Sequence, residues 1–164
     1  MIYYSTWQNN WCPVLFISVF SAVQKRLTLN TYLMKFLVVD DEKDVEMLFR
    51  QKFRKEIRSG DLEMVFAFSG NEAMELLNST NPPEVVYVFS DINMPGMTGI
   101  ELLEKIKTNF PEIYVSMISA YGDDANYKRA IESGAKEFFT KPIDFDSLKS
   151  EIKEMINKKK QEKS

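Results

Sequence analysis

Strand-like and helix-like patterns alternate along the chain from Met34 onward. Short runs rich in apolar and β-branched residues predict five strands, and the run 85–89 is continuously apolar, which indicates a strand covered on both faces. Apolar residues at helical spacing among charged ones predict a helix after each strand. We expect strands at 35–39, 63–68, 85–90, 113–119 and 135–140, and helices at 45–57, 70–79, 100–110, 123–134 and 144–160.

Apolar spacing also predicts which side chains of two helices face the core. The first helix should end before Gly60, since glycine commonly follows the last helical turn. The residues expected to point inward are Val45, Leu48, Phe49, Phe53 and Ile57 in the first helix and Leu148, Ile152, Met155 and Ile156 in the last.

Strict alternation of strands and helices predicts an α/β fold, with a five-stranded parallel sheet inside a three-layer sandwich. Right-handed crossovers place the carboxyl ends of all strands on one edge, which is where open parallel sheets bind their ligands. The polar residues that follow the strands should therefore meet at this edge. They are Asp40, Asp41, Asp91, Ser119 and Lys141.

Composition narrows the chemistry further. The chain has 164 residues, of which 45% are hydrophobic and 27% charged, as in an ordinary single globular domain. Cys12 is the only cysteine, so no internal disulfide can form, and we expect a cytoplasmic protein. Histidine is absent, which excludes histidine ligands, a histidine base and a phosphohistidine within this chain. The net charge of −3 gives no general attraction to nucleic acid or anionic membranes.

The first 33 residues differ from the rest of the chain. They contain no Asp or Glu, and Lys25 and Arg26 are their only basic residues. The apolar run 12–23 is too short for a membrane-spanning helix, and no basic residue precedes it as in a secretory signal. Three interpretations stay open: an untranslated upstream stretch, a membrane or export segment, or an extra packing element. We favour the first, with a non-domain extension at 1–33, a domain at 34–158 and a basic tail at 159–164.

The residues expected at the sheet edge favour phosphoryl chemistry. Three carboxylates repel one another unless a cation joins them, and oxygen ligands alone suit Mg2+, or Mn2+, rather than zinc. Lys141 can pair with a phosphoryl oxygen, and the Ser119 hydroxyl can donate to another. A carboxylate such as Asp91 can also act as a nucleophile toward phosphorus. Each residue alone has an ordinary structural role, but their coincidence on one edge favours a site.

Four sequence motifs resemble those of response-regulator receiver domains in two-component signalling. They are "FLVVDDE", "SDINMPGMTGIELL", "MISAYGD" and "AKEFFTKPID", in the order and spacing of the family. The resemblance extends from Met34 to about Lys158 and is closest to single-domain, chemotaxis-type regulators. It implies a flavodoxin-like sheet with strand order 2-1-3-4-5.

The resemblance also implies roles for individual residues. Asp91 corresponds to the phosphoacceptor, Asp40 and Asp41 to the acidic metal pair, and Asn93 to the residue whose backbone carbonyl binds Mg2+. Ser119 and Lys141 correspond to the hydroxyl and the amine that contact the phosphoryl group, Pro142 to the proline after a cis peptide, and Phe138 to an aromatic switch. The family more often has Thr than Ser at 119 and Tyr than Phe at 138.

Two further residues bear on access to the site. Ala120 is small enough to leave a phosphoryl group on Asp91 reachable. The ring of Tyr121 can lean over that group and slow the attack of water, so we expect slow hydrolysis.

Together these features predict a phosphoacceptor switch rather than an ordinary enzyme. The donor would be a histidine kinase or a phosphotransfer protein. The output would be a protein contact, or a homodimer, through the fourth helix, fifth strand and fifth helix, unless the chain is a receiver cut from a larger protein. Three alternatives remain. A Mg2+-dependent phosphatase with an aspartate nucleophile is disfavoured because position 93 is Asn rather than an acid, and a nucleotide-binding module is disfavoured by the lack of a Gly-rich loop. The third is an interaction domain without phosphorylation.

Overall fold

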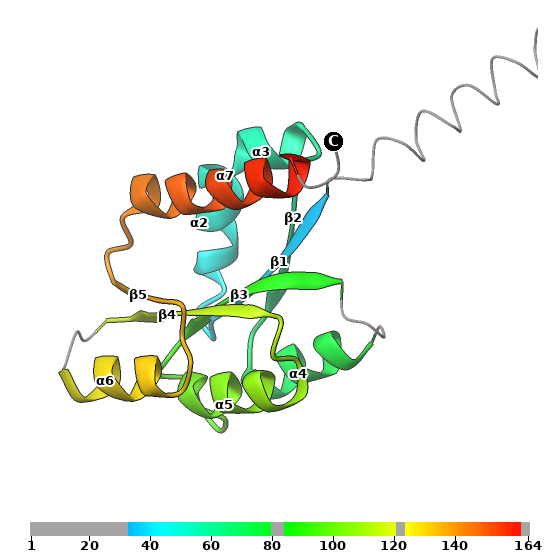
Figure 1. The fold of residues 1–164 in the computed structure, drawn as a ribbon. Coiled ribbons are helices and arrows are strands. Elements are labelled where there is room, and N and C mark those ends of the chain that lie inside the picture. The colour runs from blue at the N-terminus through cyan, green and yellow to red at the C-terminus, as the bar shows by residue number, and fades with distance from the viewer. Residues whose placement is uncertain (1–32, 80–83, 121–123, 162–164) are drawn as a thin grey trace, which may run out of the picture. The chain divides into compact units, whose positions relative to one another are not determined.

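The computed structural model describes residues 33–79, 84–120 and 124–161, which form a parallel sheet between two layers of helices (Figure 1). The sheet has the order β2-β1-β3-β4-β5, and every neighbouring pair is parallel. Both the fold class and the strand order expected from the sequence are confirmed. The strands are β1 Met34–Val39, β2 Leu62–Ala67, β3 Val85–Asp91, β4 Tyr114–Ser119 and β5 Glu137–Thr140.

Helices cover both faces of the sheet, with α2, α3 and α7 on one side and α4, α5 and α6 on the other (Figure 1). None of the helices in the described part of the chain is long and apolar enough to cross a membrane. The predicted extension lies outside the described residues except for its last one, and the first residues of the predicted basic tail are still helical. The helices are α2 Asp44–Lys52, α3 Arg54–Arg58, α4 Gly70–Asn78, α5 Gly99–Asn109, α6 Asp124–Glu132 and α7 Phe145–Gln161.

The predicted first helix is two helices, which corrects the sequence-based expectation. Phe53 has φ −99° and ψ 18°, outside the helical region, although its amide still donates to the Phe49 carbonyl at 2.9 Å. No proline or glycine marks this break in the sequence. Leu48 is 38% exposed, so its expected inward position is wrong, whereas Phe49 and Phe53 are fully buried. The two phenylalanines are four residues apart and define the buried stripe, which Leu48 flanks.

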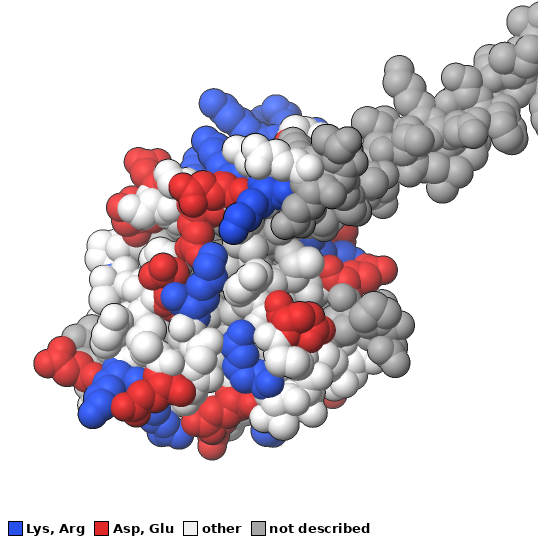
Figure 2. Space-filling view, in the orientation of Figure 1, with Lys and Arg blue, Asp and Glu red and all other residues white. Residues whose placement is uncertain are grey.

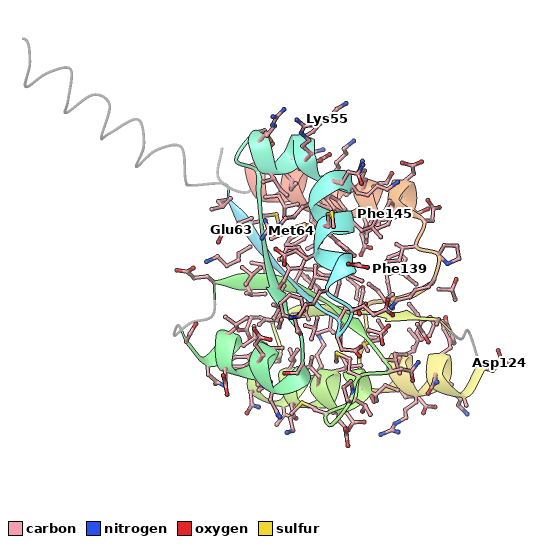
Figure 3. The ribbon with its side chains drawn as sticks, turned by 180° about the vertical axis from the view of Figure 1, so that it is seen from behind. Lys55, Glu63, Met64, Asp124, Phe139 and Phe145 are labelled. Carbon is pink, nitrogen blue, oxygen red and sulfur yellow. The ribbon has the colours of Figure 1, made fainter. Side chains whose placement is uncertain are left out.

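The two faces of the sheet have different cores. The face under α2 and α7 is rich in aromatic rings, and Figure 3 shows Phe139 and Phe145 on this side. The opposite core, under α4 and α5, is mainly aliphatic. Tyr87, Val88 and Phe89 of β3 are all fully buried, which confirms that the central strand is covered on both faces.

The loop after β3 brings α5 against the end of that strand. Gly96 has φ +78°, a conformation that favours glycine. Thr98 caps α5 through a reciprocal pair of bonds with Glu101. A Cβ on Gly99 would lie 2.0 Å from the Asp91 carbonyl oxygen, so only glycine allows this approach. The start of α5 and the end of β3 are therefore held together by backbone contact.

We expect Gly99→Ala to destabilise the domain by about 2–4 kcal/mol, because the new methyl group overlaps backbone rather than a movable side chain. Gly96→Ala is the matched control. It places its methyl group where no atom lies within 4 Å. Its only expected cost is the free energy of holding alanine in the left-handed conformation, about 1–2 kcal/mol. Urea unfolding of both variants measures the difference. Equal losses would show that the close approach at Gly99 is relaxed easily.

Candidate functional site

The carboxyl edge of the sheet gathers the polar residues that the sequence predicted there. Asp40 directly follows β1 and is 4% exposed, while Asp91 ends β3 and is 5% exposed. Ser119 ends the next strand, β4, and is fully buried. Because β1, β3 and β4 are neighbours in the sheet, these three residues lie at adjacent strand ends.

Lys141 is the cation of this edge and bridges the two buried acids. Its Nζ lies 3.0 Å from Asp40 Oδ2 and 2.9 Å from Asp91 Oδ1. Its backbone amide donates to the Ser119 carbonyl at 2.8 Å, which ties it to the end of β4. The Lys141–Pro142 peptide is cis, as the resemblance implied. The lysine is therefore held in place by the sheet as well as by its charge.

In each buried carboxylate, one oxygen accepts a backbone amide and the other faces Lys141. Asp40 Oδ1 accepts the Glu42 amide at 2.9 Å, and Asp91 Oδ2 accepts the Asn93 amide at 2.6 Å. The other oxygen of each acid faces Lys141. Backbone amides two residues further along thus orient both carboxylates toward one shared cation.

Burial and pairing oppose each other in this cluster. Burial raises the pKa of Asp40, and the negative charge of Asp91 adds to that rise, although the Glu42 amide and Lys141 act against it. Burial lowers the pKa of Lys141, but its hydrogen bonds to Asp91 and Asp40 outweigh this and the net pKa is raised. Lys141 therefore stays charged at neutral pH.

The expected cluster of three acids is only a pair. Asp41 is exposed, and no group of three His, Cys, Asp or Glu side chains within the described residues could hold a metal ion. Asp41 lies one residue further from the end of β1 than the buried Asp40, and burying a third charge beside one cation would be costly. The expectation that three carboxylates converge is therefore corrected to Asp40 and Asp91.

The carboxylate oxygens of Asp40 and Asp91 still suit a hard cation. Two buried carboxylates share one lysine, so this buried set carries more negative than positive charge when both acids are ionised. All of its ligand atoms are oxygens, which suits Mg2+ or Mn2+. A divalent cation at this edge would offset the net negative charge of the two buried carboxylates.

The other predicted residues are placed as follows. Phe138 of β5 is half-buried, and its ring packs edge-on against Tyr127 of α6 with centroids 5.5 Å apart. Asn93 and Ala120 are exposed, and Tyr121 lies outside the described residues.

Sequence reasoning missed two contacts. Glu42 Oε1 lies 3.6 Å from Lys141 Nζ, and Tyr127 is the ring partner of Phe138. The acidic run "DDE" could have indicated the first of these, while no local signal indicates the second.

Known proteins resemble this chain over the same residues. A family model described as the response regulator receiver domain matches residues 36–153. Sporulation initiation phosphotransferase F of Bacillus subtilis is 30% identical over 122 residues, covering 74% of this chain and 93% of that protein. Chemotaxis protein CheY of Listeria monocytogenes is 34% identical over 117 residues, covering 71% and 92%. A solved receiver domain from Clostridium thermocellum matches with a TM-score of 0.67 at 27% identity, covering 78% and 98%.

Replacing Lys141 with Met should make stability depend on pH. Without the cation, the pKa of Asp40 should rise further above its unfolded value. A carboxyl whose pKa is raised in the folded state binds its proton more tightly there, so the folded state loses stability as pH rises above about 4. In metal-free buffer we expect Lys141→Met to cost about 1–3 kcal/mol near pH 7 and less near pH 4.

Lys105→Met is the control, because Lys105 is exposed on α5 and makes no ion pair among the described residues. Chemical unfolding at several pH values measures both variants. A loss at Lys141 that does not depend on pH, or that matches Lys105→Met, would contradict the bridging role.

Proposed function

This chain belongs to the response regulator receiver domain family, and on that premise we propose that it accepts a phosphoryl group on Asp91 and transmits the change to a protein-binding surface. The chain holds no histidine, so the phosphoryl group comes from a phosphohistidine of a partner, a histidine kinase or a phosphotransfer protein. The protein is a signalling switch and assists only its own phosphorylation and slow dephosphorylation.

The shared lysine is the observation that carries this proposal. Asp91 ends the central strand, and Lys141 contacts it at 2.9 Å while also holding Asp40. A cation fixed beside a carboxylate in this way can also pair with the anionic oxygens of a phosphoryl group on that carboxylate. Lys141, which now pairs with the Asp91 carboxylate, is thus positioned to pair with a phosphoryl group attached to it.

Asp40, Asp91 and the backbone carbonyl of Asn93 are the groups that would hold Mg2+, with Asp41 adding negative charge from the exposed side. A metal ion held by these groups would supply positive charge to offset the charge of an incoming phosphoryl group. The geometry supports this assignment, because two buried carboxylates share one lysine and the set is net negative when both acids are ionised.

The transfer itself is a displacement at phosphorus. A carboxylate oxygen of Asp91 forms the new bond to phosphorus while the bond from phosphorus to the donor imidazole breaks, and the imidazole nitrogen keeps the electron pair. Lys141 stabilises the charge on the transferring group. The Ser119 hydroxyl donates to another phosphoryl oxygen, while Ala120 leaves room for the group and Tyr121 restricts water.

The switch begins at Ser119 and ends at Phe138. When Ser119 turns toward the phosphoryl group, it leaves space behind β4 that the half-buried ring of Phe138 can enter. The surface that changes is formed by α6, β5 and α7, and it would bind a downstream protein or a second copy of the chain. Figure 2 shows both signs of charge interspersed over much of the visible face, rather than one continuous field that would favour a nucleic acid.

We expect acetyl phosphate and Mg2+ to add one phosphoryl group to the protein, and Asp91→Asn to lose it, because an amide cannot form the acyl phosphate. Intact mass spectrometry measures both. A chelator should abolish the labelling of the unchanged protein.

Asp61→Asn is a control, because Asp61 carries the same side chain but directly precedes β2, at the edge of the parallel sheet opposite to the site. It should be labelled as the unchanged protein is. Undiminished phosphate on Asp91→Asn would assign the acceptor to another residue and overturn the proposal.

A further inference from the structure

A tyrosine lies fully buried in the central strand of the sheet. Tyr87 stands four positions before Asp91 in β3 and has no exposed surface. A buried phenol needs hydrogen-bond partners, and Tyr87 has two on different elements. Its hydroxyl lies 2.6 Å from Ser116 Oγ of β4 and donates to Glu151 Oε1 of α7 at 2.9 Å.

The direction of these bonds follows from the single hydroxyl proton. The Tyr87 hydroxyl uses that proton to donate a hydrogen bond to Glu151, so in the bond between Ser116 and Tyr87 the Ser116 hydroxyl is the donor. Glu151 is also paired with Lys136, whose Nζ lies 5.1 Å from the centre of the Tyr87 ring. The donors thus end on one carboxylate, and such chains strengthen each of their bonds.

This network joins the elements that the proposed switch would move. Ser116 belongs to β4, which ends in Ser119, and Glu151 belongs to α7. Lys136 immediately precedes β5, and its amide donates to the Val115 carbonyl at 2.7 Å. Tyr87 ties all three to β3, the strand that carries Asp91.

We propose that Ser116, Tyr87, Glu151 and Lys136 form a latch that holds α7 against β3 and β4 and thereby opposes the change that phosphorylation of Asp91 produces. This inference rests on the proposed function. In the arrangement that the latch stabilises, Lys141 contacts both Asp40 and Asp91.

The geometry makes the latch sensitive to small movements. Apolar contacts weaken gradually as two surfaces slide, but a hydrogen bond of 2.9 Å is lost after a shift of roughly 1 Å. Displacing α7 would break the Tyr87–Glu151 bond, so the buried Tyr87 and Ser116 hydroxyls would keep only the bond between them, and Glu151, whose side chain is 19% exposed, would lose one of its donors. An arrangement in which α7 moves is therefore disfavoured.

A ligand that favours the moved arrangement must overcome this preference. The apparent affinity for such a ligand falls by the fraction of molecules that are already competent to bind it. Removing one hydrogen bond of the latch should raise that fraction, and the expected gain in affinity is about 2- to 10-fold.

Tyr87→Phe tests the latch with little effect on packing. It removes only the hydroxyl and keeps the ring. The centre of that ring lies 4.6 Å from the centre of the stacked Phe89 ring and 5.5 Å from the centre of the Phe36 ring. Glu151→Gln is the second variant, since it removes the charge that pairs with Lys136. Glu154→Gln on the same helix is the matched control, because Glu154 is exposed and makes no ion pair within the described residues.

The measurement is the dissociation constant of beryllofluoride, a phosphoryl mimic, in the presence of Mg2+. We expect both latch variants to bind it about 2- to 10-fold more tightly than the unchanged protein, and Glu154→Gln to bind it equally. Unchanged or weaker binding by both, even with lower stability in urea, would show that the network is only structural.

The two proposals fail in different ways. If the unchanged protein binds beryllofluoride and accepts phosphate while both latch variants bind as it does, the latch alone is wrong. If the unchanged protein neither binds beryllofluoride nor accepts phosphate, the proposed function is wrong and the latch, which rests on it, falls as well.

Discussion

One lysine holds two buried acids together, and much of the site depends on that contact. Asp40 directly follows β1 and Asp91 ends the neighbouring strand β3, so the topology brings their carboxylates together. Without a cation, burial and mutual repulsion would favour protonation of one of them. Lys141 lies 101 positions after Asp40 in the sequence. Its side chain contacts both acids and its backbone amide donates to the end of β4, so it connects the ends of β1, β3 and β4. Phosphorylation would act on this same contact.

The two faces of the sheet contribute differently to such a switch. The aliphatic face supports α5, whose close approach at Gly99 fixes the backbone of Asp91. The aromatic face, in contrast, includes polar contacts that end on α7, the helix we expect to move. A rigid contact therefore lies behind the proposed acceptor Asp91, and directional hydrogen bonds lie where we expect a rearrangement.

Most of the fold, and the position of the candidate site residues at the sheet edge, were predictable from the sequence, because they depend on local patterns. The continuous apolar run before Asp91 indicated a buried central strand, and the residue after each strand indicated the site. The break at Phe53 and the exposure of Leu48 were not predictable, because tertiary packing decides them. The Tyr87–Glu151 bond joins residues 64 positions apart, and Tyr87 looks like any other residue of an apolar run. Likewise, the spacing of Asp40 and Asp41 does not reveal that only Asp40 is buried.

The most direct test of the central claim is a crystal structure of the protein with Mg2+ and beryllofluoride. The account predicts that beryllofluoride is attached to Asp91 and that Lys141 Nζ leaves Asp40 to contact a fluorine atom. It also predicts that Asp40 and Asp91 would both contribute ligands to the metal ion. A complex in which Lys141 still bridges both acids, or in which the analogue is bound elsewhere, would contradict the view that this shared cation prepares the site for a phosphoryl group.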